Sequence, residues 1–234
     1  MRHASTVIAL GSIDIIAKGQ RLAAHLLGAE ADAIVFDDGV FRLGEKSFTW
    51  FELARHADDE GLPEDLRGGL KVRRDNEMHT PVFPNGTCIC EIEIDPDTGS
   101  LEITRYSTVD DVGRCINPLI VHGQTHGGIA MGVGQALWEQ CFIDEASGQP
   151  LSGSFMDYGM PRFDNLPSFN SEIAEVLSPT NPFGVKAGGE GGTTPAPAVI
   201  MSAIEDALSE FGPLDISMPA TPGKIWAAIQ KSRA

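Results

Sequence analysis

The chain has 234 residues, a hydrophobic fraction of 42% and a net charge of -16, which suits one large globular domain or two small lobes. Because phosphate groups repel so acidic a protein, the charge argues against nucleic acid and anionic membranes as partners. No apolar run approaches the ~18 residues of a membrane-spanning helix, and the first residues do not form a signal-peptide core. We therefore expect a cytoplasmic protein without a membrane span.

The first part of the chain predicts a helix, a hairpin and a second, short helix. Apolar residues repeat at helical spacing over 12–27, and Gly28 ends this helix. Asp38-Gly39 joins two short apolar runs in a tight hairpin. Residues 49–52 form a capping box that opens the next helix. Residues 57–80 are polar and irregular, which predicts a long surface loop.

The middle of the chain predicts an antiparallel hairpin and two further strands. Residues 87–95 alternate between small or apolar and acidic side chains, which is typical of a strand with one wet face. The turn 95–99 returns the chain into a second strand at 101–106. Further strands are expected at 152–160 and 171–177.

Four cysteines stand at positions 88, 90, 115 and 141. They form no CxxC pair and lack the histidine partners of a zinc site. We expect buried, reduced thiols that act as small hydrophobic residues.

A glycine-rich helix is predicted to start at Asn117-Pro118 and to run to about Gln140. Its interior glycines are Gly123, Gly127, Gly128, Gly132 and Gly134. Each costs about 1 kcal/mol relative to alanine, so a ligand or a tightly packed element must come very close to this helix. Two more helices are expected at 200–211 and 221–231.

Residues 184–195, GVKAGGEGGTTP, form a glycine-rich loop with one lysine and one carboxylate. Glycines let backbone amides approach a ligand, and a helix N-terminus favours anions. Thr193 or Thr194 is expected to cap the helix that follows. The spacing fits neither a phosphate P-loop nor a dinucleotide fingerprint. The residues alone leave open a ligand loop with Glu190 as base or a flexible connection with Glu190 in solvent.

Two histidines on the glycine-rich helix, His122 and His126, are spaced as a metal-binding pair would be, but no Glu or third ligand accompanies them. We therefore assign no metal ligand. A hydrolase that uses Glu190 with one of these histidines would need a nucleophile motif, and the sequence offers none.

Three stretches together resemble a known family: DDVG, NP and GQ within 110–124, GVGQAL at 132–137 and KAGGE at 186–190. They are similar to the molybdenum-binding (large) subunit of the xanthine dehydrogenase, aldehyde oxidase and carbon monoxide dehydrogenase family, its C-terminal part only. The resemblance implies an α+β fold in which antiparallel hairpins pack on helices in the lobes of a molybdenum cofactor-binding domain. We expect these lobes at about 1–80 and 81–234.

The resemblance also implies residue roles. Glu190 matches the active-site base, which takes a proton from the oxygen nucleophile beside the molybdenum. Gln124 matches a glutamine that hydrogen-bonds the pterin, and the metal itself is held through the pterin dithiolene rather than by a side chain. The remaining expected cofactor contacts are Lys186, Ala187, Gly188, Gly189, Ser5 and Thr6. Gly191 departs from the family pattern, which has Ala or Pro after the glutamate, and this difference loosens the loop.

These roles imply part of a molybdenum hydroxylase or dehydrogenase that oxidises an aldehyde or N-heterocycle with water as oxygen source. The cofactor would be molybdopterin or molybdopterin cytosine dinucleotide, with [2Fe–2S] clusters and FAD on partner chains. Because the family's first half is missing from the sequence, we expect a partner chain that carries it and no activity of this chain alone. The alternative is a non-catalytic relic or scaffold subunit that binds a partner but no cofactor.

Overall fold

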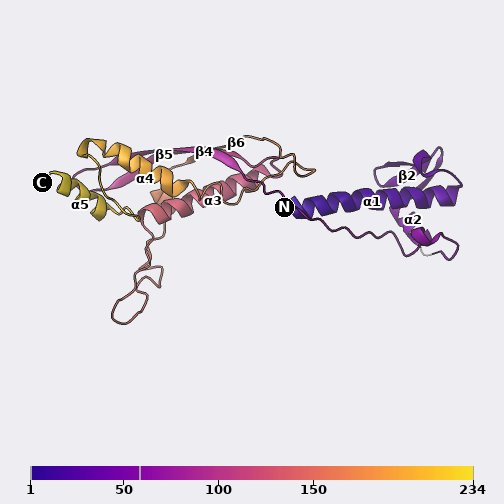
Figure 1. The fold of residues 1–234 in the computed structure, drawn as a ribbon, viewed down its shortest axis with the longest axis horizontal. Helices are drawn as coiled ribbons and strands as arrows, with labels where there is room; N and C mark the ends of the chain where they lie inside the picture. The colour runs from indigo at the N-terminus through magenta and orange to yellow at the C-terminus, as the bar shows by residue number, and fades with distance from the viewer. Residues whose placement is uncertain (1, 58, 234) are drawn as a thin grey trace. The chain divides into compact units, whose positions relative to one another are not determined.

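The computed structural model describes residues 2–57 and 59–233, and the α+β class expected from the sequence is confirmed (Figure 1). The chain divides into two compact units. The first comprises Met1–Pro81 with Asn181–Phe183, and the second comprises Val82–Thr180 with Gly184–Ala234. Each unit has its own cluster of buried apolar side chains.

In the first unit, α1 (Arg2–Leu27) packs against a small antiparallel sheet. The strands lie in the order β1 (Val35–Asp37), β2 (Val40–Leu43) and β3 (Lys46–Thr49). Phe41 of β2 is fully buried, and a Cβ at Gly19 of α1 would come within 2.4 Å of its ring. Gly19 therefore lets the helix lie directly on the sheet.

The predicted hairpin and capping box of this unit are confirmed. Asp38 and Gly39 have φ angles of 43° and 77°, as a tight turn requires. Thr49 caps α2 (Trp50–His56): its side chain accepts a hydrogen bond from the Glu52 amide, and Glu52 accepts one from the Thr49 amide. The polar stretch after α2 holds only the short helix η2 (Glu64–Leu66) among its described residues.

The predicted start of the first helix is wrong, because α1 begins at Arg2 rather than Ser12. The hydroxyls of Ser5 and Thr6 donate to the carbonyl oxygen of Arg2 at 3.2 and 2.8 Å, so these polar side chains are accommodated inside the helix. The sequence analysis did not predict the strand β3 or the short helix η1 (Ala31–Ala33).

The second unit is built on the sheet β4 (Asn85–Ile94), β5 (Leu101–Asp111) and β6 (Phe169–Ile173). β4 and β5 form the predicted antiparallel hairpin, and β6 pairs in parallel with β5. Exposed and half-buried residues alternate from Thr87 to Ile94, which confirms the strand with one wet face. β5 is longer than predicted and ends with Asp110 and Asp111.

Three helices share a buried apolar cluster with this sheet: α3 (Pro118–Leu137), α4 (Ala196–Ala207) and α5 (Pro222–Arg233). α4 packs against both β4 and α3 (Figure 1). Tyr106 of β5, Ile129 of α3, Ile200 of α4 and Ile225 of α5 are completely buried in one cluster. Within each helix the buried residues recur at helical spacing, as Ile200 and Ile204 do in α4, so burial of one face of each helix forms the core.

Several predicted boundaries are wrong. Residues 152–160 form turns rather than a strand: the amides of Asp157 and Tyr158 both bond the Ser154 carbonyl. The strand expected at 171–177 is β6, which ends at Ile173. α3 ends at Leu137, three residues before the predicted Gln140. The segment between α3 and β6 also contains the short helix η3 (Phe163–Asn165), and η4 (Ser209–Phe211) follows α4.

The cysteines are free thiols, as predicted, but they are less buried than expected: three are half-buried and Cys141 is exposed. Burial raises the pKa of Cys90 to about 11, so this thiol stays protonated and unreactive at neutral pH. None of the helices within residues 2–57 and 59–233 has the length and hydropathy needed to cross a bilayer.

Candidate cofactor site

Glu190 lies on the exposed part of the loop that leads into α4. It lines a cavity of about 340 Å³ between this loop, the start of β4 and the end of β5. Asp110, Thr108 and Cys88 from the two strands line the same cavity, and so does Phe83, which precedes β4. The glutamate predicted as a base therefore lies at a cavity large enough for part of a small molecule.

The structure brings Gln124 and the loop together. Asn117 caps α3 by accepting a hydrogen bond from the Ile120 amide at 3.3 Å, with Pro118 in the first turn. Gln124 follows on an exposed face of this helix, and its Nε2 donates to the Gly189 carbonyl oxygen at 2.9 Å. Two of the residues expected at the cofactor are therefore in direct contact.

Two of the five interior glycines of α3 explain how the loop and the start of α4 come so close, and a third, Gly134, lets the segment after α3 approach. A Cβ at Gly128 would lie 2.9 Å from the Thr193 amide nitrogen, and one at Gly132 would lie 2.5 Å from the Ala196 Cβ. A Cβ at Gly134 would lie 2.8 Å from Pro161. A tightly packed element thus approaches α3, as predicted. Gly123 and Gly127, in contrast, have nothing within 4 Å of a built Cβ.

The start of α4 differs from the prediction. Pro195 occupies the N-cap position, and no side chain caps the helix, so Thr193 and Thr194 do not have the predicted role. The Thr194 amide instead donates to the Glu190 carbonyl oxygen at 3.0 Å. This bond closes a turn directly after the glutamate and fixes its backbone.

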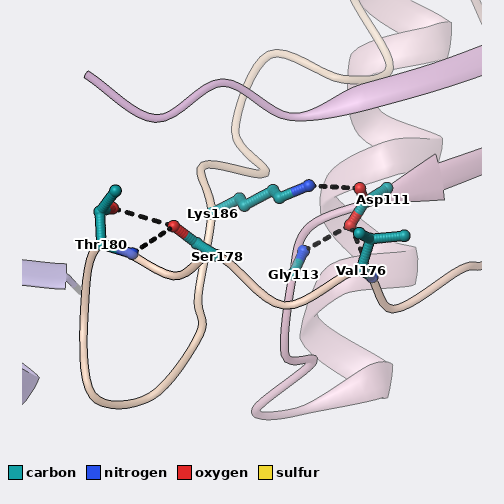
Figure 2. Close-up of polar contacts among 6 residues, drawn as sticks. All are labelled: Asp111, Gly113, Val176, Ser178, Thr180 and Lys186. Atoms are coloured by element: carbon teal, nitrogen blue, oxygen red, sulfur yellow. Dashed lines mark hydrogen bonds and ion pairs between the residues drawn. The ribbon is translucent and has the colours of Figure 1, made fainter. Parts of the chain in front are cut away.

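Lys186 is engaged inside the protein (Figure 2). Its Nζ lies 2.5 Å from Oδ2 of Asp111, and both side chains are only 11% exposed. Oδ1 of Asp111 also accepts hydrogen bonds from the amides of Gly113 at 2.8 Å and Val176 at 3.1 Å. Burial alone would raise the pKa of Asp111, but Lys186 and the two amides outweigh it and hold this pKa below its ordinary value.

The backbone amides of Ala187, Gly188 and Gly189 take part in none of the hydrogen bonds found among the described residues. Gly189 is exposed, and a Cβ there would meet nothing within 4 Å. These amides can therefore donate to a ligand. This donor set fits an anionic or carbonyl-rich group such as a pterin or its phosphate.

Asp110 lines the cavity, but the sequence analysis included it only in a motif and assigned it no role. The residue is 5% exposed, and Thr125 of α3 donates to its Oδ2 at 3.2 Å. Burial raises the pKa of Asp110 above its ordinary value. A carboxyl group that ends a mostly buried strand was the available signal, because such a group needs partners.

His122 and His126 both contact the Ser171 hydroxyl of β6, at 2.8 and 2.9 Å. One hydroxyl can donate to one ring and accept from the other. Within the described residues there is no group of three His, Cys, Asp or Glu side chains that could hold a metal ion. The pair therefore anchors α3 to β6.

Ser5 and Thr6 belong to the first unit, on α1, and the other predicted site residues belong to the second. Thr6 is buried, and Ser5 is half-buried. Their hydroxyls already donate to Arg2, so only their oxygen lone pairs can serve a ligand. Their contact with a cofactor stays a prediction.

Comparison with known proteins identifies the family. Residues 7–167 match the family model of the molybdopterin cofactor-binding domain. The 6-hydroxypseudooxynicotine dehydrogenase complex subunit gamma of Paenarthrobacter nicotinovorans is 36% identical over 97% of this chain and 29% of its own length. The carbon monoxide dehydrogenase large chain of Afipia carboxidovorans is 31% identical over 95% of this chain and 28% of its own length.

Solved structures give the same result. A Cu,Mo-CO dehydrogenase in its carbon monoxide reduced state matches with a TM-score of 0.81 and 30% identity, over 98% of this chain and 29% of that chain. Quinoline 2-oxidoreductase from Pseudomonas putida matches with a TM-score of 0.80 and 32% identity, over 93% of this chain and 28% of that chain. The chain spans less than a third of the length of these relatives. It belongs to the molybdopterin cofactor-binding domain family and corresponds to a C-terminal part of the molybdenum-binding subunits.

Proposed function

We propose that this chain supplies the active-site base and part of the cofactor site of a molybdenum-dependent hydroxylase or dehydrogenase. The observation that carries this proposal is the placement of Glu190. It lies at a cavity, on a loop that Gln124 contacts at 2.9 Å through Gly189 and that leaves its own amides available. The family match adds the cofactor class to this geometry.

When bound, a molybdenum cofactor supplies the oxygen transfer, with water as the source of oxygen, and accepts two electrons from the substrate. Glu190 takes the proton that the oxygen nucleophile loses as it attacks an electron-poor carbon. Because Glu190 is exposed on its loop, it can pass this proton on to water. The turn closed by the Thr194 amide fixes the backbone that carries this carboxylate.

The cofactor would lie along the loop. We assign hydrogen bonds to it from Gln124 and from the amides of Ala187, Gly188 and Gly189, with Lys186 nearby. We also assign contacts with the cofactor to Ser5 and Thr6 of α1. The bound form is molybdopterin or its cytosine dinucleotide.

We propose that the substrate is an N-heterocycle rather than an aldehyde. The nicotine 6-hydroxylase large subunit of Paenarthrobacter nicotinovorans, 36% identical over 89% of this chain and 26% of its own length, is named for a reaction on an N-heterocycle. The solved quinoline 2-oxidoreductase is named for another. This preference rests on these likenesses, since the cavity beside Glu190 has no side chain specific for either class.

A partner chain is part of the proposal. Apolar side chains lie exposed on the segment between α3 and β6, which extends away from the sheet of its unit (Figure 1). Met156 is 92% exposed and Phe163 is 98% exposed, while Leu119 at the start of α3 is 81% exposed. Exposed apolar surface of this extent marks a protein interface. We propose that it meets the rest of the molybdenum subunit, with iron–sulfur and flavin chains further along the assembly, all in the cytoplasm.

The test is Glu190→Gln in the assembled enzyme. The variant should keep its molybdenum content and lose at least ~100-fold in turnover, because the amide cannot take a proton. Glu210→Gln removes an exposed carboxylate outside the cavity and serves as the matched control. Normal turnover of Glu190→Gln at full molybdenum content would refute the assignment.

A further inference from the structure

The ion pair between Lys186 and Asp111 joins three segments of the second unit (Figure 2). Asp111 ends β5, Val176 belongs to the stretch after β6, and Lys186 begins the glycine-rich loop. With the ammonium group on one oxygen and two amides on the other, the buried carboxylate is fully satisfied. Removal of either partner would leave a buried charge without compensation.

Backbone contacts of the same segments reinforce the pair. The Lys186 amide donates to the Val112 carbonyl oxygen at 2.8 Å. The Gly184 carbonyl oxygen accepts from the amides of both Arg114 and Ser178, each at 3.0 Å. A Cβ at Gly113 would lie 2.2 Å from this carbonyl oxygen, and Gly113 has a φ of 67°, so only glycine allows so close an approach.

We infer that Lys186 is a positioning residue: its ion pair with Asp111 fixes the first part of the loop and so holds Gly189 against Gln124 and Glu190 at the cavity. This inference rests on the proposed role of Glu190. It also gives a function to Asp111, which neither lines the cavity beside Glu190 nor contacts the amides of residues 187–189. Because the Lys186 side chain is only 11% exposed and its ammonium group is already paired, Lys186 acts on the cofactor through the loop rather than by direct contact.

Direct contact and positioning predict different patterns in variants of the assembled enzyme. If Lys186 contacted the cofactor, Asp111→Asn would leave its ammonium group available and molybdenum content unchanged. If the ion pair positions the loop, Asp111→Asn and Lys186→Met should lower the molybdenum content to the same extent. The double variant should then be no worse than either single variant, since the two changes break one interaction.

Hydrogen–deuterium exchange of peptides within 184–194 measures this directly and does not depend on turnover. We expect exchange at least about tenfold faster in both single variants, together with lower molybdenum content. Lys231→Met and Asp206→Asn remove exposed charges elsewhere in the same unit and should change neither quantity. If Asp111→Asn does not fold, Asp111→Glu replaces it, because the extra methylene displaces the carboxylate while keeping its charge.

Unchanged exchange in the Asp111 variant, or molybdenum loss in Lys186→Met alone, would overturn the inference. Failure of the proposed function is a separate outcome. It would appear as normal turnover of Glu190→Gln, and the coupling between Lys186 and Asp111 in the exchange experiment would then still stand.

Discussion

The two ends of the glycine-rich loop differ from its middle. At the first end, Lys186 is paired with Asp111. At the other end, Gly192 is packed so tightly on α3 that a Cβ would lie 2.3 Å from the Thr125 carbonyl oxygen. Between them, Gly189 has one hydrogen bond, from Gln124, and nothing within 4 Å of a built Cβ.

This difference separates two uses of glycine in one loop. At the ends, glycine permits close packing, which fixes where the loop begins and finishes. In the middle, it leaves backbone amides uncovered, so that they can donate to a ligand. A loop with fixed ends and an uncovered middle can present Glu190 in one place while its neighbours bind a group from outside the chain.

The largest expected effect comes from adding one methyl group at a fixed end. Gly192→Ala should lower the free energy of unfolding by about 3 kcal/mol, because the new Cβ overlaps a backbone carbonyl of α3 that cannot move easily. Gly189→Ala adds the same methyl group in the middle of the loop, where nothing lies within 4 Å of a built Cβ. This variant should change the free energy of unfolding by less than about 1 kcal/mol. Urea unfolding of the two variants compares them, and equal losses would contradict the packing account.

A smaller effect is expected from acid. The lowered pKa of Asp111 means that its ion pair stabilises the fold above its ordinary pKa of about 3.9, and that this stability is lost as the pH falls below it. Unfolding measured at pH 6 and pH 3 should therefore show a smaller acid loss in Asp111→Asn than in the wild type. The same acid loss in both proteins would show that the pair contributes nothing.

The neighbouring Asp110 should behave in the opposite way. Burial raises its pKa, so the folded state holds this proton more tightly than the unfolded state, and stability is lost as the pH rises through the raised value. Asp110→Asn keeps an acceptor for Thr125 and removes the titration. Its stability relative to the wild type should therefore increase between pH 3 and pH 7, and a constant difference would contradict this sign.

The smallest expected effect is a gain in stability. Gly123 lies on the exposed face of α3 with nothing within 4 Å of a built Cβ, so Gly123→Ala should stabilise the chain by about 0.5–1 kcal/mol. If a partner or ligand lies against this face in the assembled enzyme, the same change should weaken assembly. Thermal unfolding of the chain and its co-purification with the partner are the two measurements. A loss of stability in the chain itself would mean that the face is already packed.

Sequence periodicity and capping predicted most elements of the second unit. The alternation in β4, the Asn117-Pro118 start of α3 and the apolar spacing of α4 each follow from one local rule. The strand predicted at 152–160 is wrong, and the apolar side chains of Phe155 and Met156 in this stretch are exposed rather than buried. Surface that needs a partner looks like core in a single sequence.

The candidate site was predicted in part. The resemblance selected Gln124, the loop and Glu190, and the structure brings Gln124 and the loop into contact. Neither Asp110 nor Asp111 could be assigned individually, because their roles depend on Thr125 and Lys186, which are distant in sequence. Long-range pairs of this kind have no local signature.

The most direct test of the central claim is molybdenum content, measured by elemental mass spectrometry on the chain purified alone and with a co-expressed partner that carries the rest of the molybdenum subunit. We predict close to one molybdenum per assembled complex and little or none in the chain alone. No molybdenum in either preparation would contradict the account and favour a scaffold subunit that binds its partner without a cofactor.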